Sequence, residues 1–134
     1  MGLKELVRYL ALAKLCNNVV ALKTLEMYFV IGRSPGEIAK SLGVSKDTVR
    51  GYIERAVKNA GGPAKTPALV RAVLPHIAAV KPVIEPSNTM YRCVLCGESF
   101  MSIGNAMLHV RNSHRDALEQ AFEAIMRSVA NNAD

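Results

Sequence analysis

Four residues with metal-binding side chains gather in the last third of the chain. Cys93 and Cys96 form a C-x2-C pair, and His109 and His114 follow with the overall spacing C-x2-C-x12-H-x4-H. Thiolate and imidazole are donors that zinc accepts, and structural zinc takes four of them in a tetrahedron. A site closed by four protein ligands leaves no position for a catalytic water. The spacing therefore predicts one zinc ion with a structural role.

The residues around these ligands follow a familiar pattern. Tyr91 lies two positions before the first cysteine. Gly97 directly follows the second cysteine, and Phe100 lies four positions after that cysteine. Residues 91–115 thus resemble the two-Cys, two-His zinc finger family, which implies a small ββα unit with an aromatic core residue. Ala106 departs from that pattern, because the family usually has Leu three positions before the first histidine. We expect an undersized finger core that depends on the rest of the protein.

The same resemblance indicates which finger residues would contact DNA bases. Counting back from the first histidine, these positions fall on Ser102, Gly104, Asn105 and Leu108. Only Asn105 has a side chain suited to reading a base edge, and Leu108 is apolar. Fingers that bind DNA also usually occur in tandem, whereas this one is single. We therefore expect the finger to pack or to contact protein rather than to read DNA.

Helical periodicity and breaking residues predict the elements that must position these side chains. Apolar residues at helical spacing predict helices over 3–16 and 19–31, separated by Asn17-Asn18, and a third over 67–80 that Pro75 kinks or splits. Residues 81–90, which include two prolines, are predicted to form a linker. We expect a mainly α fold, with a helical domain over 1–80 and a zinc finger with an extended C-terminal helix over 91–134.

Two short helices with clear start signals are predicted within the first domain. Ser34-Pro35 with Glu37 forms a capping box with proline at the first helical position, and Ser45 caps a second helix after a turn at Gly43. Residues 34–58 resemble the helix-turn-helix DNA-binding family. In this comparison Ala39 takes the place where the two helices touch. The shared core is then predicted from these residues: Ile38, Leu42, Val44, Val49 and either Tyr52 or Ile53.

This resemblance implies that the second helix enters the major groove of double-stranded DNA by its N-terminal end. The candidate DNA-contacting residues are Ser45, Lys46, Asp47, Arg50, Gly51, Arg55 and Lys58. Arg50 suits a guanine edge or a phosphate, and Lys46 suits a phosphate. Gly51 would allow the helix backbone to come close to the DNA. A helix-turn-helix beside a single finger further suggests a small regulator of archaeal type.

Charge supports a polyanionic partner for the first part of the chain. The formal net charge is +6, and residues 1–86 hold 13 Lys and Arg against 6 Asp and Glu, a balance of +7. DNA is the first candidate and RNA the second, while a solvated basic surface is the simpler reading. No stretch approaches the ~20 apolar residues of a membrane span. We expect a cytoplasmic, nucleoid-associated protein with no membrane partner.

The remaining reactive residues give no sign of catalysis. His76 is the one histidine outside the zinc motif and follows a proline in an apolar segment, so a structural role is expected. Cys16 stands alone in an apolar helix and is expected to be a small buried hydrophobe. No nucleophile–base pairing, carboxylate cluster or phosphate-binding loop stands apart from the zinc ligands. The sequence therefore predicts a protein that is not an enzyme.

The final helix carries one apolar stripe that must be covered. The stripe consists of Leu118, Ala121, Phe122, Ile125, Met126 and Val129. It could pack on the N-terminal helices, or residues 116–130 could form a homodimer. Taken together, the sequence predicts a DNA-binding transcription regulator. The alternative is a nucleic-acid-associated subunit or interaction module of a polymerase, ribosome or recombination complex.

Overall fold

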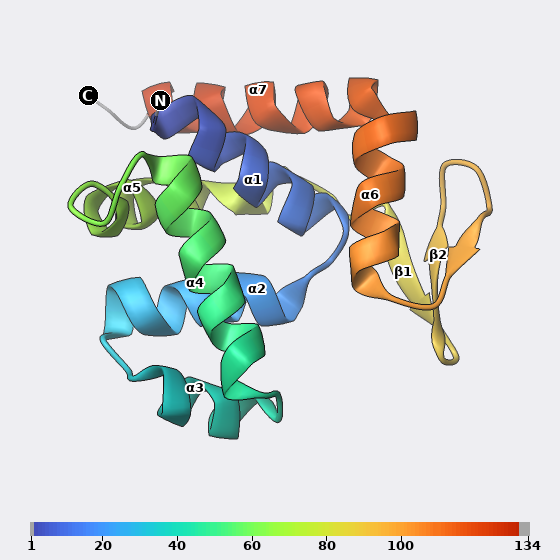
Figure 1. The fold of residues 1–134 in the computed structure, drawn as a ribbon. Coiled ribbons are helices and arrows are strands. Elements are labelled where there is room, and N and C mark those ends of the chain that lie inside the picture. Colours follow the sequence, from blue (N-terminus) through green and yellow to red (C-terminus); the bar gives the residue numbers. More distant parts are fainter. Residues whose placement is uncertain (1, 132–134) are drawn as a thin grey trace.

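The protein was analysed as a computed structural model, which describes residues 2–131. Seven α-helices, a π-helical turn, a 3-10 turn and a three-stranded antiparallel sheet make up this part of the chain (Figure 1). The elements are α1 (Leu3–Leu15), α2 (Val19–Leu25), η1 (Glu26–Ile31), α3 (Pro35–Leu42), α4 (Lys46–Ala60), α5 (Thr66–Val73), η2 (Leu74–Ala79), β1 (Ile84–Ser87), β2 (Met90–Cys93), β3 (Ser99–Phe100), α6 (Ile103–Ser113) and α7 (Arg115–Asn131). The mainly α fold class, with a small ββα-like region before a long final helix, is confirmed.

Helix α1 lies at the centre of the molecule and joins its two halves. It packs against α2, α4 and α5 from the first half, and against α6 and α7 from the second. One buried cluster accordingly takes residues from both predicted domains. Its members include Leu6, Val7, Leu10, Leu25, Val70, Val73, Ile84, Cys93, Ala106, Val110, Phe122 and Ile125. Because apolar burial is the main stabilising contribution to folding, the two halves should stabilise each other.

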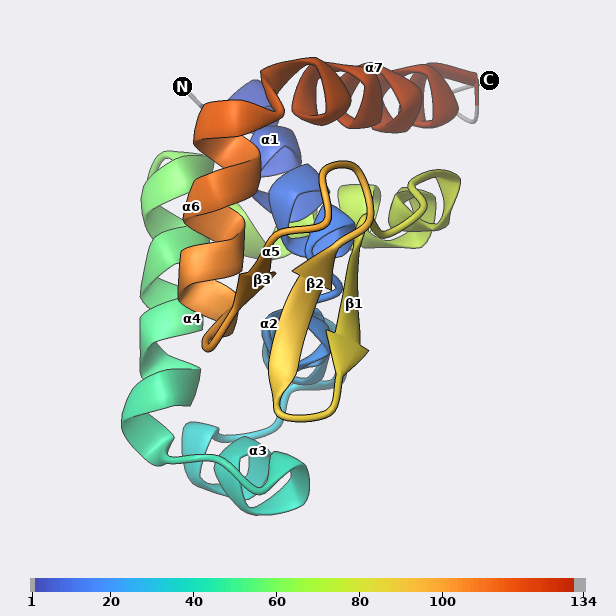
Figure 2. The same ribbon diagram turned by 90° about the vertical axis from the view of Figure 1, so that its right-hand side faces the viewer.

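The predicted linker over residues 81–90 is corrected by the structure, because it contains strand β1. This strand pairs antiparallel with β2, with Ile84 opposite Cys93, and Ile84 is almost fully buried. Two backbone bonds hold it in place: Val83 N–H donates to the Leu15 carbonyl at the end of α1, and Val94 N–H donates to the Val83 carbonyl. The strand lies at the sheet edge (Figure 2), where Pro86 is tolerated although it lacks an N–H.

Two predicted helices change their hydrogen-bonding pattern before they end. The predicted helix over 19–31 is α-helical to Leu25 and π-helical from Glu26, and it stops at Gly32 in a left-handed conformation. The predicted kink at Pro75 is confirmed, since α5 continues there as the 3-10 turn η2. None of the helices in the described part of the chain combines the length and the apolar character needed to cross a membrane.

The apolar stripe of α7 is covered within the same chain. Ala121, Phe122 and Ile125 are buried, and α7 packs along α1 and against η2 (Figure 1). His76 Nδ1 lies 2.7 Å from the Ser128 hydroxyl oxygen, which joins η2 to α7. His76 thus has a polar partner in the folded protein, as a structural histidine requires.

Candidate metal centre and the α3–α4 pair

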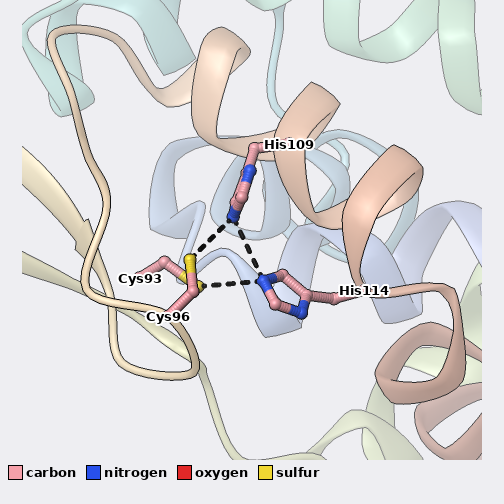
Figure 3. A group of neighbouring side chains, drawn as sticks. All are labelled: Cys93, Cys96, His109 and His114. Carbon is pink, nitrogen blue, oxygen red and sulfur yellow. Dashed lines mark hydrogen bonds between the residues drawn. The ribbon is translucent and has the colours of Figure 1, made fainter.

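The four predicted ligands converge on a single point (Figure 3). Their donor atoms all lie within 4.8 Å of one another. Cys93 Sγ is 3.6 Å from His114 Nε2, Cys96 Sγ is 3.3 Å from His109 Nε2, and the two Nε2 atoms are 3.1 Å apart. The arrangement could hold one metal ion.

These separations resemble those of a tetrahedral zinc site. Bonds of about 2.3 Å to sulfur and about 2.0 Å to nitrogen, at tetrahedral angles, place sulfur and nitrogen about 3.5 Å apart and two nitrogens about 3.3 Å apart. The observed distances of 3.6, 3.3 and 3.1 Å differ from these values by only a few tenths of an ångström. Two thiols and two imidazoles form a donor set that suits zinc, whereas calcium and magnesium bind oxygen ligands.

The two cysteines are presented by a tight turn between β2 and β3. Cys93 N–H donates to the Glu98 carbonyl and Gly97 N–H donates to the Cys93 carbonyl, each with an N–O distance of 2.7 Å. Gly97 has φ of +84°, a left-handed conformation that favours glycine. The turn therefore depends on the glycine that follows the second cysteine, and it places both sulfurs on one side.

The two histidines come from the end of α6. His109 lies within the helix, whereas His114 is its C-cap, with φ of −129° and ψ of 50°. Since the chain leaves helical geometry at His114, two histidines five positions apart can face the same centre. Pairs at i and i+4 face one another more closely in a regular helix, so the departure from helical geometry at His114 compensates for the extra residue between the two histidines.

A carboxylate that the sequence analysis did not single out supports one of the histidines. Glu98 Oε2 lies 3.2 Å from His109 Nδ1, on the opposite side of the ring from the metal-facing Nε2. A proton on Nδ1 would make this contact and leave Nε2 as a free donor for a metal, as in known carboxylate–histidine–metal arrangements. The Phe100 ring packs on the same imidazole, with ring centroids 4.7 Å apart. His109 is thus fixed by two neighbours.

The three cysteines differ in their exposure to solvent and in their surroundings. Cys93 is fully buried and Cys96 is exposed. Burial raises the pKa of the Cys93 thiol, so a positive ion would be needed to stabilise its thiolate at neutral pH. Cys16 is fully buried in α1's C-cap position, and burial raises its pKa to about 12. The prediction that Cys16 is a small buried hydrophobe is confirmed.

The finger's expected base-contacting positions lie at the start of α6 or along the side of α6 that faces the helical half of the protein. The Ser102 hydroxyl accepts from Asn105 N–H and caps α6, so it serves the helix. Gly104 and Leu108 line a groove between α6, α1 and α4. Ala106, where the family has Leu, is fully buried in the cluster shared with α1. The small side chain at this position suits close packing of α6 on α1.

The α3–α4 pair has the predicted caps and turn. The Ser34 hydroxyl accepts from Glu37 N–H, the Glu37 carboxylate accepts from Ser34 N–H, and the Ser45 hydroxyl accepts from Thr48 N–H. Gly43 has φ of +69°, which allows the tight turn between the helices. A small separate cluster holds the pair together. It consists of Ile38, Ala39 and Val49, with Met27, Leu42, Val44 and Ile53 packed around it.

The predicted DNA-contacting residues do not share a single face of α4. Arg50 follows Lys46 by about 40° around the helix, but Arg55 lies about 140° from Arg50. Lys46, Arg50 and Lys58 are all exposed, and Gly51 is half-buried. The Arg55 guanidinium lies over the Tyr52 ring, 5.4 Å from its centroid, on the wall of the groove beside α6. Arg55 therefore stands apart from the basic N-terminal end of α4.

The remaining residues of the predicted set surround this N-terminal end. Ser45 is the cap, and Asp47 lies in the first turn, 4.0 Å from the Arg50 guanidinium. That contact is long and largely exposed to solvent, so it should hold Arg50 only weakly. Comparison of the whole chain with known proteins adds no assignment: no family model, no curated protein and no solved structure matches it.

Proposed function

We propose that this chain is a DNA-binding transcription regulator that uses α4 as its recognition helix. The observation that supports this most is the presentation of α4. Its N-terminal turn carries Lys46 and Arg50, and both side chains are exposed, although Lys46 runs beside Gly36 of α3. A helix N-terminus with cationic side chains suits phosphates and guanine edges in a major groove.

Several further features are compatible with this role. The balance of +7 over residues 1–86 favours approach to a polyanion. The same N-terminal end of α4 carries Ser45 and Asp47. Gly51 lies further along the helix, and Lys58 lies in its last turn. An added Cβ at Gly51 would meet only Arg55 Nη2, at 3.8 Å, so nothing within the protein requires glycine there. A helix that must approach DNA closely provides a reason for it.

We further propose that the metal is one zinc ion with a structural role. All four donors come from the protein, so the site would be closed to a catalytic water. When bound, zinc would supply folding energy to the turn and the helix end that carry its ligands. Cys93, Cys96, His109 and His114 would be its ligands, with Glu98 orienting His109.

A nucleic-acid-associated subunit of a larger complex is the second candidate function. Exposed apolar side chains favour it: Leu95 and Val94 lie at the tip of the metal turn, and Met101 is 81% exposed. Such side chains on a folded surface are suited to contact with another protein. In this role the basic half would contact DNA or RNA with little sequence preference, and the protein would act without catalysis.

Selection of DNA from random duplexes tests the first proposal. Zinc-loaded protein is incubated with a random duplex library, and the retained DNA is sequenced. An enriched motif, lost in Arg50→Ala and kept in Arg127→Ala, would support a sequence-specific regulator; Arg127 is an exposed arginine on α7 that, like Arg50, lies near an acidic residue of its own helix. Retention without enrichment would favour the subunit, and no retention at low salt would refute the regulator.

Oligomeric state and location are also proposals. A palindromic motif would indicate a homodimer. Because the apolar stripe of α7 packs on α1, a dimer through residues 116–130 would have to use the outer face of this helix. As a DNA-binding protein the chain would be expected in the cytoplasm, associated with the nucleoid.

A further inference from the structure

A groove runs along α1 between α4 and α6. Both helices pack on α1, one on each side (Figure 1), and their upper parts diverge over it. The groove encloses about 800 Å³. This volume lies within the range of about 300–1,000 Å³ that is typical of small-molecule sites.

A buried amide connects two of the side chains at one end of the groove, Tyr52 and Met107. Asn18, the N-cap of α2, is 4% exposed, and its Nδ2 lies 3.3 Å from the Tyr52 hydroxyl on α4 and 3.4 Å from Met107 Sδ on α6. The same side chain accepts from Ala21 N–H, which fixes its orientation. The groove therefore has defined walls at this end.

Much of the lining is apolar. Leu12 of α1, Met107 of α6 and Leu118 of α7 contribute aliphatic or thioether surface, and Tyr9 and Tyr52 contribute aromatic surface. Leu108, at the edge, is 48% exposed. A lining of this kind would gain free energy by covering an apolar ligand.

Three arginines from three different helices line the same groove: Arg8, Arg55 and Arg111. Arg8 is engaged elsewhere, because its guanidinium is 3.0 Å from Glu119 and lies over the Phe122 ring. Among the described residues, neither Arg55 nor Arg111 forms an ion pair with a carboxylate. Two guanidinium groups without acidic partners thus face an apolar groove.

Two polar groups of the lining bear on the charge that this groove would accept. The Glu5 carboxylate is engaged at the start of α1, where it accepts from Gly2 N–H at 2.7 Å. The Tyr9 hydroxyl is buried, and burial raises its pKa to about 12 while the neighbouring Arg55 guanidinium acts in the opposite direction. A positive guanidinium therefore lies beside an uncharged phenol in this lining.

We infer that the groove binds a small amphiphilic anion. Its acidic head would pair with Arg55 and Arg111, and its apolar body would lie over Leu12, Met107 and the tyrosine rings. Guanidinium groups bind carboxylates through two parallel hydrogen bonds, which makes them suited to such a head group. This site lies on a different side of α4 from Arg50 and does not depend on the proposed binding of DNA.

Isothermal titration of the zinc-loaded protein with decanoate and with 1-decanol tests this inference, because the two probes share an apolar chain and differ in the head. Decanoate should bind at least about tenfold more tightly than decanol. The double variant Arg55→Gln/Arg111→Gln should remove this difference. The matched control, Arg33→Gln/Arg71→Gln, changes two arginines that line a different hollow and should bind decanoate like the wild type.

A second variant tests the location without removing a charge. Gly104 lines the groove and has open space around it, since an added Cβ would meet only Ser102 Oγ, at 3.9 Å. Gly104→Phe should therefore fold and should weaken both probes by at least about tenfold, because it fills the groove. Equal binding of the two probes, unchanged decanoate binding in either groove variant, or no decanoate binding to the wild type would overturn the inference.

Discussion

Removal of the metal should destabilise the whole molecule, including the helices before residue 80. The reason lies in the shared core. Cys93 and Ile84 of the sheet and Val110 of α6 belong to the same buried cluster as Leu6 and Leu10 of α1. If the ββα region loses its metal and loosens, α1 loses apolar neighbours on one side.

The size of this destabilisation follows from the free energy with which zinc binds the folded state. A ligand that binds only the folded state stabilises it by about 4 kcal/mol when its free concentration is about a thousand times Kd. For 134 residues the entropy of unfolding is roughly 0.3 kcal/mol per kelvin, so removing zinc under these conditions should lower Tm by roughly 15 °C. A domain of this size has a stability of about 5–15 kcal/mol, so the metal-free chain can remain partly or fully folded at room temperature.

Thermal unfolding followed by circular dichroism at 222 nm provides the assay. The wild type is measured with excess zinc and with a chelator, and Cys96→Ser is measured under both conditions. Cys96 is exposed, so its substitution leaves no cavity in the core and should act through the metal. The variant in zinc should unfold near the chelated wild type and respond little to chelator. Leu95→Ser, at an exposed neighbour that is not a ligand, is the matched control.

The shape of the transition decides between a shared core and two separate domains. A single transition that moves as a whole, with all helical signal lost together, is expected. The division into domains 1–80 and 91–134 instead implies that Cys96→Ser unfolds only the second domain. Two transitions, with most of the helical signal unaffected by chelator, would therefore refute the argument from the shared core.

Four further substitutions give defined outcomes. Glu98→Gln should weaken zinc binding by about 10–100-fold in a competition titration with a chelator, because His109 loses its carboxylate partner; unchanged affinity would remove this role. Arg50→Ala should weaken DNA binding in a gel-shift assay while changing stability by less than about 0.5 kcal/mol. Gly51→Ala should stabilise the protein by up to about 1 kcal/mol in urea, because alanine favours helix, yet weaken DNA binding if close approach matters. Ala106→Leu should destabilise the protein by about 1–3 kcal/mol in urea through overpacking, whereas a gain in stability would indicate a loose finger core.

Local signals in the sequence were sufficient for the features that depend on near neighbours. The capping box at Ser34, the turn at Gly43 and the split at Pro75 are each decided by residues within one or two turns. The metal ligands are similar, because side-chain chemistry and spacing restrict which residues can meet at one ion. Their positions were therefore predictable without knowledge of the rest of the fold.

Features that depend on distant partners were not predictable in this way. Residues 81–90 contain two prolines and polar residues, and they form a strand only because β2 and the end of α1 supply hydrogen-bond partners. The contact of Glu98 with His109 depends on the turn between β2 and β3, which the linear spacing does not reveal. The groove depends on α1, α4 and α6 together, and thus on packing alone.

The alanine at position 106, where the finger family usually has Leu, depends both on the local pattern and on distant packing partners. In an independent finger the residue at this position must help to fill a small core from within the unit. Here α6 packs directly on α1, and Ala106 is fully buried in the cluster that both helices share. A larger side chain would separate the two helices, while alanine allows close approach at no cost in helix propensity. The departure from the family pattern is thus explained by the neighbour: α1 supplies the apolar surface that a separate finger would lack, and a bound metal would in turn hold in place the elements that cover α1.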